Sequence, residues 1–285
     1  MSNLKLAIQK KGRLNEKSIS LLKECGISFT DLSTSLKTTA RNFPLEVLLL
    51  RDDDIPQYIE QGIADIGILG LNEVLEKNRN VTIAKKLGFG QCRLSLALPK
   101  EASYDGPQDL AGKRIATSYP LILEKFLEEK GIQAQIEQIG GSVEIAPSIG
   151  LSEAVFDIVS TGSTLLTNGL KEVEKVLESE AVLISSPALS SEKEALLNKL
   201  LFRIDAVLGA REHKYILLNA PNAALDQIIE LLPGMKSPTV LPLATSGWSS
   251  LHTVIREDSF WEIIDELQLL GAEGILVVPI EKMIR

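Results

Sequence analysis

Short apolar segments alternate with amphipathic segments over the first two thirds of the chain. The apolar segments have the composition of buried strands, and between them apolar residues recur at helical spacing. One predicted helix contains Leu121, Phe126 and Leu127 and stops at Gly131. This alternation predicts a largely parallel α/β sheet, whose ligand crevice lies at the carboxyl ends of the strands. Strands are predicted at residues 5–9, 46–51, 65–70, 93–99, 114–118 and 157–160.

Two segments of this region resemble each other. Residues 62–70 read GIADIGILG and residues 153–162 read EAVFDIVSTG, so each runs from a helix end through an aspartate into a short strand that ends at glycine. One interpretation is that the chain folds into two related α/β lobes that face each other across a cleft. The alternative is that both segments are common strand endings, and so few matches do not decide between the two.

A different pattern follows in the last third of the chain. Residues 191–210 carry the apolar stripe of a long amphipathic helix. After it the predicted order is strand, helix, strand, strand, helix, strand, which is the ferredoxin-like arrangement. The strands are predicted at 214–219, 239–243, 248–255 and 274–279, and the helices at 223–232 and 258–270, the first ending at Pro233-Gly234.

The expected fold is therefore α/β, with a two-lobed core like that of periplasmic binding proteins and a C-terminal ferredoxin-like (ACT-like) α+β domain. Lobe I should comprise residues 1–94 and 180–211, lobe II residues 95–179, and the small domain residues 212–285. A chain of 285 residues is long enough for two or three domains.

The composition limits the classes of function. The formal net charge of -8 argues against a general nucleic-acid binder, because such a protein needs a basic face to neutralise phosphates. No secretory signal is evident at the beginning of the sequence, and no segment approaches the roughly 18 apolar residues that span a bilayer. Cys25 and Cys92 show no metal-binding spacing. We expect a cytoplasmic protein with neither a membrane nor a nucleic acid as its partner.

The stretch DIVSTGSTL, residues 157–165, carries the most chemical information. A buried strand runs into a loop of small hydroxyl residues and then into a helical segment. Backbone N–H groups, hydroxyls and a helix N-terminus bind terminal phosphates, and Gly162 lets the backbone approach closely. Taken alone, the loop could be an ordinary turn with a helix cap. Asp157 favours a ribose phosphate as the ligand, because an acid beside a phosphate site can hold the sugar hydroxyls.

Glu144 is a second candidate acid. It lies in the apolar run GSVEIAP, just before Pro147, where a surface charge is less expected. Its carboxylate could recognise hydroxyls or stabilise a cationic sugar. It could also be a solvated residue at an edge, and the neighbouring residues do not decide between these roles.

Basic residues follow two of the predicted strands. Lys10, Lys11 and Arg13 come after the first strand. Arg51 ends the next one, immediately before three aspartates. Each could be a solvated surface charge. A cation at the carboxyl end of a strand points into the crevice, however, so two such strand ends favour the binding of a polyphosphate.

Together these stretches resemble the ATP phosphoribosyltransferase family, and the resemblance covers nearly the whole chain. One motif would be weak evidence, whereas nine in the same order are specific. The C-terminal motifs are typical of the long form, since short forms lack this tail and depend on a separate synthetase-like regulatory subunit. The motifs are QKKGRL, RDDDIP, DIGILG, GFGQCRLSLALP, GKRIATSYP, GSVEIAP, DIVSTGSTL, LLPGMKSPT and GAEGILVVPIEKMI.

The resemblance implies roles for individual residues. Glu144 and Asp157 would be the catalytic acids that face the ribose. The regulatory inhibitor L-histidine would contact Met235, Ser237 and Thr239, although this stretch by itself could be a plain helix-to-strand connection. The 5′-phosphate of phosphoribosyl pyrophosphate would bind Ser160, Thr161, Gly162, Ser163 and Thr164. ATP would be bound, and the cleft lined, by Lys10, Arg13, Arg51, Asp65, Glu73, Arg93 and Tyr119.

Two positions depart from the family pattern. Residues 151–154 read LSEA, whereas the family usually has LADA, so Glu153 puts a longer carboxylate where an aspartate is usual. Ser163 stands where the family more often has Ala or Arg, which leaves the backbone of the loop intact but removes one cationic contact.

The implied reaction is displacement of pyrophosphate from phosphoribosyl pyrophosphate by N1 of ATP, the first step of L-histidine biosynthesis. Mg²⁺ would be carried by the pyrophosphate, and no covalent nucleophile is needed. The resemblance also implies feedback inhibition by L-histidine and a hexamer that exchanges with dimers. Two other classes stay open: a solute-binding protein, which shares the two-lobed architecture, and an amino-acid-responsive regulatory protein, which the ferredoxin-like tail would suit.

Overall fold

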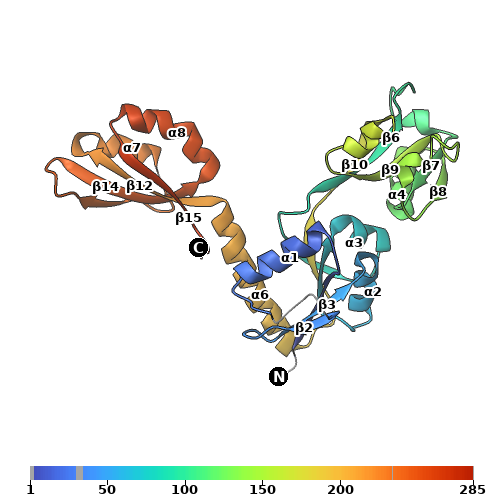
Figure 1. Ribbon diagram of the computed structural model, residues 1–285, viewed down its shortest axis with the longest axis horizontal. Coiled ribbons are helices and arrows are strands. Elements are labelled where there is room, and N and C mark those ends of the chain that lie inside the picture. Colours follow the sequence, from blue (N-terminus) through green and yellow to red (C-terminus); the bar gives the residue numbers. More distant parts are fainter. Residues whose placement is uncertain (1–2, 30–34, 233, 285) are drawn as a thin grey trace. The chain divides into compact units, whose positions relative to one another are not determined.

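The structure is a computed structural model that describes residues 3–29, 35–232 and 234–284. The chain divides into two compact units, Met1–Ser20 with Ile27–Leu197, and Leu21–Gly26 with Asn198–Arg285. The described residues form three β-sheets, two in the first unit and one in the second (Figure 1). Pro233, at which the sequence predicts the end of a helix, lies outside the described residues.

The first sheet is the centre of lobe I and has the strand order β2-β3-β1-β4-β11-β5. β1 pairs in parallel with β3 and β4, while β11 runs antiparallel to both of its neighbours. Leu6, Ala7 and Ile8 of β1 are fully buried, as in a strand covered on both faces. The elements are β1 Leu4–Gln9, α1 Arg13–Glu24, β2 Lys37–Thr39, β3 Leu45–Leu50, α2 Ile55–Glu60, β4 Ile66–Gly70, α3 Leu71–Lys77, β5 Thr82–Lys86 and β11 Ala181–Ser185.

The second sheet is the centre of lobe II and has the strand order β10-β6-β9-β7-β8. β7 pairs in parallel with β8 and β9, and β6 runs antiparallel to β9 and β10. Phe156 of β9 is fully buried in a core that includes Leu123 and Phe126 of α4. The elements are β6 Cys92–Pro99, β7 Arg114–Thr117, α4 Pro120–Lys130, β8 Gln135–Gln138, β9 Ala154–Val159, α5 Ser163–Thr167 and β10 Leu170–Ser179.

The two sheets share one strand order. When β3-β1-β4-β11-β5 is laid against β8-β7-β9-β6-β10, parallel pairs match parallel pairs and antiparallel pairs match antiparallel ones. The fourth strand in each of these orders is the one at which the chain arrives from the other lobe. The chain enters lobe II at β6, after β1–β5 of lobe I, and returns to lobe I at β11, after β10 of lobe II. The prediction of two related lobes, built as in periplasmic binding proteins, is confirmed.

The two segments that resemble each other in sequence, residues 62–70 and 153–162, align differently in the structure than their sequences suggest. β4 and β9 hold the same place in the two sheets, and their first residues to pair with the central strand are Ile66 and Ala154. The residues just before them are Asp65 and Glu153, so Asp65 corresponds to Glu153 and not to Asp157. The matched aspartates were therefore a coincidence, although the two lobes are related.

Both sheets are mixed, whereas the sequence predicts largely parallel pairing. The chain returns to lobe I through β11 and reaches lobe II through β6, and each of these strands starts at the carboxyl end of its neighbour: Ala181 pairs with Gly70, and Arg93 pairs with Val159. A strand that enters a sheet from that edge must run antiparallel to it. The apolar pattern of β6 predicted a strand but carried no information on its direction.

The C-terminal unit contains the predicted ferredoxin-like domain (Figure 1). Its sheet has the order β13-β14-β12-β15 and is antiparallel throughout. Ile216, Leu218 and Leu251 from the sheet are buried in one core with Phe260 and Leu267 from α8. The elements are β12 His213–Pro221, α7 Leu225–Leu231, β13 Thr239–Pro242, β14 Trp248–Arg256, α8 Glu257–Leu269 and β15 Glu273–Pro279.

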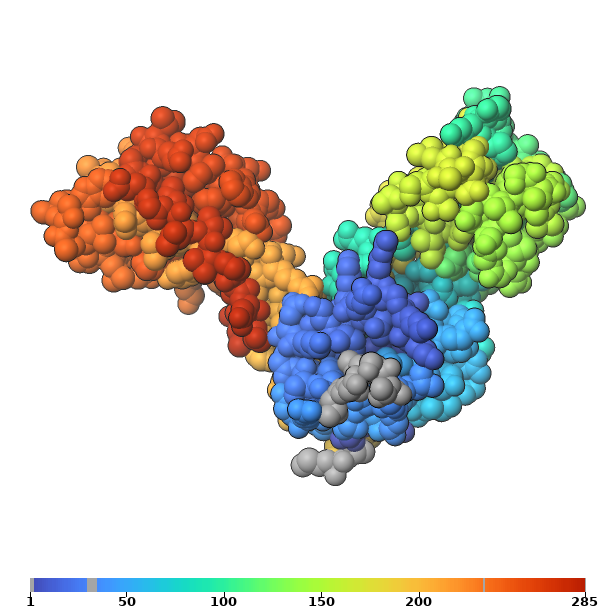
Figure 2. Space-filling model, viewed as in Figure 1, coloured from blue at the N-terminus to red at the C-terminus, as the bar shows by residue number. Residues whose placement is uncertain are grey.

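The long predicted helix is α6, Ser191–Arg211, and the division between the two compact units falls inside it. The end of the chain, dark red in Figure 2, returns to this helix: Met283 N donates to Ala206 O at 2.8 Å. The boundaries predicted at residues 94, 179 and 211 stay predictions. Within the described part of the chain, no helix has the length and apolar character needed to cross a membrane.

Candidate active site

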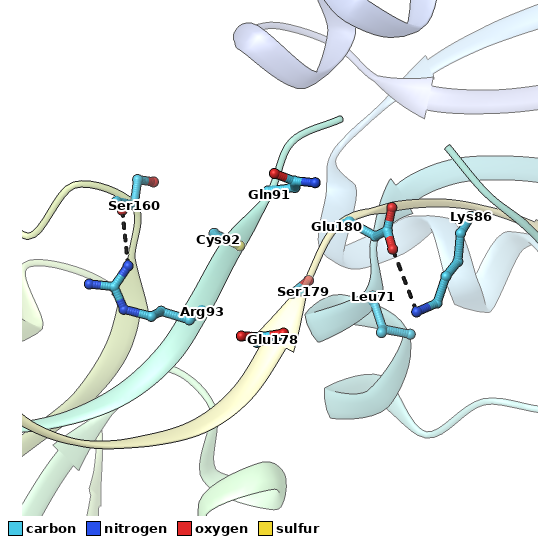
Figure 3. Close-up of a pocket in the computed structure, with 9 residues that line it drawn as sticks. All are labelled: Leu71, Lys86, Gln91, Cys92, Arg93, Ser160, Glu178, Ser179 and Glu180. Carbon is cyan, nitrogen blue, oxygen red and sulfur yellow. Dashed lines mark hydrogen bonds and ion pairs between the residues drawn. The ribbon is translucent and has the colours of Figure 1, made fainter. Parts of the chain in front are cut away.

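The two connections between the lobes run from one carboxyl edge to the other, because β6 and β11 each start there. Glu180 ties the two connections together. Its carboxylate accepts the N–H of Gly88 at 3.0 Å and lies 3.5 Å from Lys86 Nζ (Figure 3). Since loops at carboxyl edges form the crevice of an α/β sheet, functional side chains are expected beside these connections.

The predicted cations of lobe I lie together at its carboxyl edge. β1 and β3 end side by side, with Gln9 paired to Leu50, and Lys10 N donates to Leu50 O at 2.7 Å. Lys10 and Arg51 therefore follow neighbouring strand ends. Both are exposed, and Arg51 lies 3.4 Å from Asp53 in an ion pair that water can screen.

Arg13 begins α1 directly after Gly12, whose φ of +96° is one that side chains other than glycine rarely adopt. In the first turn of α1, Asn15 Nδ2 donates to Gln9 O at 2.6 Å, so the start of this helix lies beside the end of β1. The side chain of Arg13 is exposed. Lys10, Arg13 and Arg51 therefore follow strand ends at one edge of one sheet, and their binding of ATP stays a prediction.

The two predicted acids belong to lobe II. Asp157 lies in β9 and is half-buried, and Glu144 lies in a 3₁₀ turn, Val143–Ile145. Burial raises the pKa of Asp157 above its ordinary value, and the charge of Glu144 raises it further, against a hydrogen bond from Ile158 N at 2.8 Å. The two carboxylates are thus close enough to interact, and a cation between them would relieve their repulsion.

The hydroxyl loop follows β9 and leads into the short helix α5. Gly162 has a φ of +80°, so the chain reverses there, and Thr161, Ser163 and Thr164 are exposed. Thr161 Oγ1 and Ser163 Oγ are 3.0 Å apart. The loop presents several hydroxyls in one place, which is suited to binding phosphate oxygens.

Arg93, the second residue of β6, contacts this loop. Its Nη1 donates to Ser160 O at 3.2 Å (Figure 3). Both residues line a pocket of about 500 Å³ that also reaches residues of lobe I. The pocket is lined by Leu71, Lys86, Gln91, Cys92, Arg93, Ser160, Glu178, Ser179 and Glu180.

Glu73 and Tyr119, which were predicted to lie around the cleft, form a contact between the lobes. Tyr119 Oη donates to Glu73 Oε1 at 3.0 Å, and Asn72 Nδ2 donates to Glu73 at 3.2 Å. Burial raises the pKa of Glu73, with the Tyr119 hydrogen bond opposing the shift. Burial and the charge of Glu73 likewise raise the pKa of Tyr119, so its hydroxyl stays a donor.

Sequence reasoning missed a second contact between the lobes. Glu76 of α3 accepts the backbone N–H groups of Leu121 and Ile122 at the start of α4, each at 3.0 Å. A signal for it existed in the sequence. The residue before Pro120 is Tyr119, which is a poor N-cap, so the first turn of α4 had to find an acceptor elsewhere.

Asp65 is not brought to this group. It precedes β4 at the amino edge of lobe I, where it is only 5% exposed, accepts Lys5 N at 2.8 Å and pairs with Lys193 Nζ at 2.7 Å. Glu153 holds the equivalent place in lobe II, accepting Arg114 N at 2.8 Å and forming an ion pair with the Arg114 side chain. Each acid binds the neighbouring strand at the amino edge of its sheet and pairs with a basic side chain. Glu153 can make these contacts, which explains how position 153 accommodates a glutamate.

Comparison with known proteins supplies the class. A family profile described as ATP phosphoribosyltransferase matches residues 51–206, and one described as the HisG C-terminal domain matches residues 210–282. The ATP phosphoribosyltransferase of Cytophaga hutchinsonii is 57% identical over 99% of both chains. That of Phocaeicola vulgatus is 56% identical over 99% of both. The chain belongs to the ATP phosphoribosyltransferase family.

A solved ATP phosphoribosyltransferase complex from Thermotoga maritima, of HisG with HisZ, is also similar, with a TM-score of 0.60 and 32% identity. The match covers 98% of that chain but 71% of this one. Together with the C-terminal profile match, this places the chain in the long form of the ATP phosphoribosyltransferase family, with a regulatory domain appended. It is an enzyme of histidine biosynthesis, and the solute-binding and non-enzymatic alternatives are excluded.

The residues predicted to contact histidine lie in this regulatory domain but not all in one place. Met235 lines a pocket of about 510 Å³, and Gly234 beside it has a φ of +58°, with Thr253 Oγ1 only 2.4 Å from where a Cβ would be. The lining that the structure describes does not include Ser237, which is exposed, or Thr239, which belongs to β13. Sequence reasoning missed the other polar lining residues, His213, Arg256, Ser259 and Glu262.

Proposed function

We propose that the carboxyl edges of the two lobes divide the substrates of ATP phosphoribosyl transfer between them, with ATP on lobe I and phosphoribosyl pyrophosphate on lobe II. The observation that carries this proposal is their unlike chemistry. Lobe I presents exposed cations at two adjacent strand ends, and lobe II presents a hydroxyl loop beside two carboxylates. A polyphosphate suits the first edge and a ribose phosphate the second.

On lobe II, Ser160, Thr161, Gly162, Ser163 and Thr164 hold the 5′-phosphate. Glu144 and Asp157 face the ribose ring. When pyrophosphate leaves the anomeric carbon, positive charge develops on the sugar, and fixed carboxylates stabilise that charge more than the neutral ground state. The raised pKa of Asp157 supports this role, because its charge is costly to hold in the absence of a cation.

On lobe I, Lys10, Arg13 and Arg51 bind the triphosphate of ATP and so direct N1 of the adenine towards the sugar. N1 is a weak nucleophile, so its alignment with the anomeric carbon has to supply much of the rate. Glu73 and Tyr119, which join the lobes, lie where the adenine and ribose meet. Asp65 is withdrawn from this set and assigned to the amino edge, where its contacts are.

Mg²⁺ is proposed to enter as a complex with phosphoribosyl pyrophosphate. Among the described residues, no three His, Cys, Asp or Glu side chains converge on a common point where they could hold a metal ion. Mg²⁺ readily keeps waters and phosphate oxygens as its ligands, so the pyrophosphate can carry it without a protein cage. Bound in this way, it neutralises the charge of the leaving group.

The direct test of this activity is the release of pyrophosphate when the purified protein is mixed with ATP, phosphoribosyl pyrophosphate and Mg²⁺. Release should require all three, and each phosphoribosyl-ATP formed should accompany one pyrophosphate. Pyrophosphate release without ATP would instead indicate hydrolysis. That result would contradict the proposed alignment of N1.

The regulatory domain is proposed to bind L-histidine and to lower activity in a hexamer that exchanges with dimers, in the cytoplasm. Inhibition requires that histidine bind two states of the enzyme unequally, and linkage then requires substrates that favour the active state to weaken histidine binding. A chain truncated after Ala210 should lose its response to histidine. Inhibition of the truncated enzyme at the same histidine concentration would contradict a separate sensor.

A further inference from the structure

Glu172 of β10 has no role in the mechanism above, yet it makes the densest set of polar contacts near the hydroxyl loop. Its Oε1 accepts Arg93 Nε, and its Oε2 accepts Arg93 Nη2, each at 2.5 Å. Ser95 Oγ donates to Oε1 at 2.7 Å. Glu172 pairs with Ala97 of β6 across the sheet. Arg93, Ser95 and Ala97 are two residues apart, so they lie on the same face of β6.

The third arm of the same guanidinium reaches the loop. Arg93 Nη1 donates to the carbonyl of Ser160 at 3.2 Å (Figure 3). Two parallel hydrogen bonds to one carboxylate fix the plane of a guanidinium. The ammonium of a lysine has no such plane and could not be oriented in this way. With that plane set by Glu172, the directions of the other N–H groups are set as well, and Nη1 donates to Ser160, the first residue of the loop.

We propose that Glu172 is a positioning residue for the phosphoribosyl pyrophosphate loop: through Arg93 it sets the carbonyl of Ser160 and with it the hydroxyls of Thr161, Ser163 and Thr164. This inference rests on the proposed function of that loop. It also changes the expected role of Arg93, whose Nε, Nη1 and Nη2 are all engaged on lobe II, from binding ATP to supporting the loop.

The pair differs from an ordinary surface ion pair in two respects. The side chains of Arg93 and Glu172 are 31% and 27% exposed, so both are partly withdrawn from water. Ser95 satisfies a further lone pair of the carboxylate, which completes the network. The Arg93 hydrogen bond keeps the pKa of Glu172 below its usual range, so the pair stays charged at neutral pH.

The test uses the full-length enzyme with Glu172→Gln, which removes the charge but keeps the shape. Arg93→Lys, which removes the fork, is the second variant in case the first folds poorly. Glu174→Gln is the matched control: it lies on the same strand and accepts a hydrogen bond from Tyr104 at 3.1 Å, away from the loop. For each, KM for phosphoribosyl pyrophosphate, KM for ATP, kcat and Tm are measured.

Glu172→Gln should raise KM for phosphoribosyl pyrophosphate about tenfold, as expected for a weakened charge-assisted hydrogen bond, with KM for ATP within about twofold. Arg93→Lys should do the same, and Glu174→Gln should leave both constants unchanged. A rise in both KM values together, accompanied by a similar change in the Glu174→Gln variant, would mean that the strand is merely structural and would overturn the proposal.

The double variant Thr161→Val with Thr164→Val separates failure of this proposal from failure of the loop assignment. If that variant raises KM for phosphoribosyl pyrophosphate while Glu172→Gln behaves as the wild type, the loop binds phosphate but Glu172 does not position it. If neither variant changes this KM, the loop assignment fails and the positioning role fails with it. Adding Glu172→Gln to the double variant should give less than a further tenfold rise, because two of the hydroxyls it positions are already gone.

Discussion

Lobes I and II are built to one plan, but their two edges differ in how closely they match. At their amino edges they match closely: Asp65 N donates to Lys5 O and Glu153 N donates to Arg114 O, both at 2.9 Å, and each acid accepts an N–H in return. At their carboxyl edges they diverge, with cations on lobe I and acids and hydroxyls on lobe II. The shared edge therefore fixes how each sheet begins, while the divergent edge is the one at which we propose that each lobe binds its own substrate.

Asp157→Asn should have the largest effect on the divergent edge. Removal of the charge that faces the sugar should lower kcat about 100-fold, a typical loss for one electrostatic contact to a transition state. Glu128→Gln, an exposed acid of α4 in the same lobe, is the control and should be silent. Steady-state kinetics of both variants decide the matter, and an Asp157→Asn enzyme as fast as the wild type would make this carboxylate structural.

The same substitution should not lower Tm at pH 7. The pKa of Asp157 is raised in the folded protein, so its contribution to stability is present at low pH and is lost as the pH rises through that raised pKa. Asparagine removes the charge that is unfavourable at neutral pH. In the wild type, kcat/KM should fall as the pH drops through the raised pKa, and this acid limb should flatten in the variant. A clear drop in Tm would contradict the sign.

At the matched amino edges, Asp65→Asn should have the larger effect on stability and little effect on turnover. It breaks an ion pair in which Asp65 is buried and Lys193 is mostly covered. The loss should be about 2 to 3 kcal/mol, at or below the lower end of the range for buried pairs, since Lys193 keeps some contact with water. Chemical denaturation measures it. A variant of normal stability but with a raised KM for ATP would return Asp65 to the active site.

Glu153→Gln should have the smallest effect on stability among these variants, although Glu153 holds the position in lobe II that Asp65 holds in lobe I. Its ion pair with Arg114 is exposed, so most of the attraction is screened. Arg114 lowers the pKa of Glu153 to about 2 from 4.5, so the stabilisation is present above pH 4.5 and is lost as the pH falls towards 2. The gap in Tm between variant and wild type should close over that range, and a gap that widens there would contradict the assignment.

The sequence predicts the parts of this molecule that depend on local pattern. The apolar runs located β1, β3, β4, β6 and β7, and the turn at Gly162 and the cations after β1 and β3 were identified from residue type alone. Strand direction and register were not predictable in this way. β6 and β11 run antiparallel because of the edge at which they enter a sheet. Asp65 was aligned with Asp157 by sequence similarity alone, whereas the register of β4 and β9 aligns it with Glu153.

The partners in contacts between distant segments were likewise not predictable from local sequence. Nothing local to Glu76 indicates that it caps α4 of the other lobe, and nothing local to Glu172 indicates that it holds Arg93 from 79 positions away. Each depends on two strands or helices that the fold brings together. The family resemblance supplied the activity, and the structure supplied the contacts on which the proposed roles of the two edges rest.

The central claim, that the lobes divide the two substrates, is tested most directly by one crossed kinetic comparison. KM for ATP and KM for phosphoribosyl pyrophosphate are measured for Arg51→Met in lobe I and for Thr161→Val with Thr164→Val in lobe II. The lobe I variant should raise KM for ATP about tenfold and the lobe II variant KM for phosphoribosyl pyrophosphate by a similar factor, each with the other constant unchanged. A rise in the same KM for both variants, or the reverse assignment, would contradict the account.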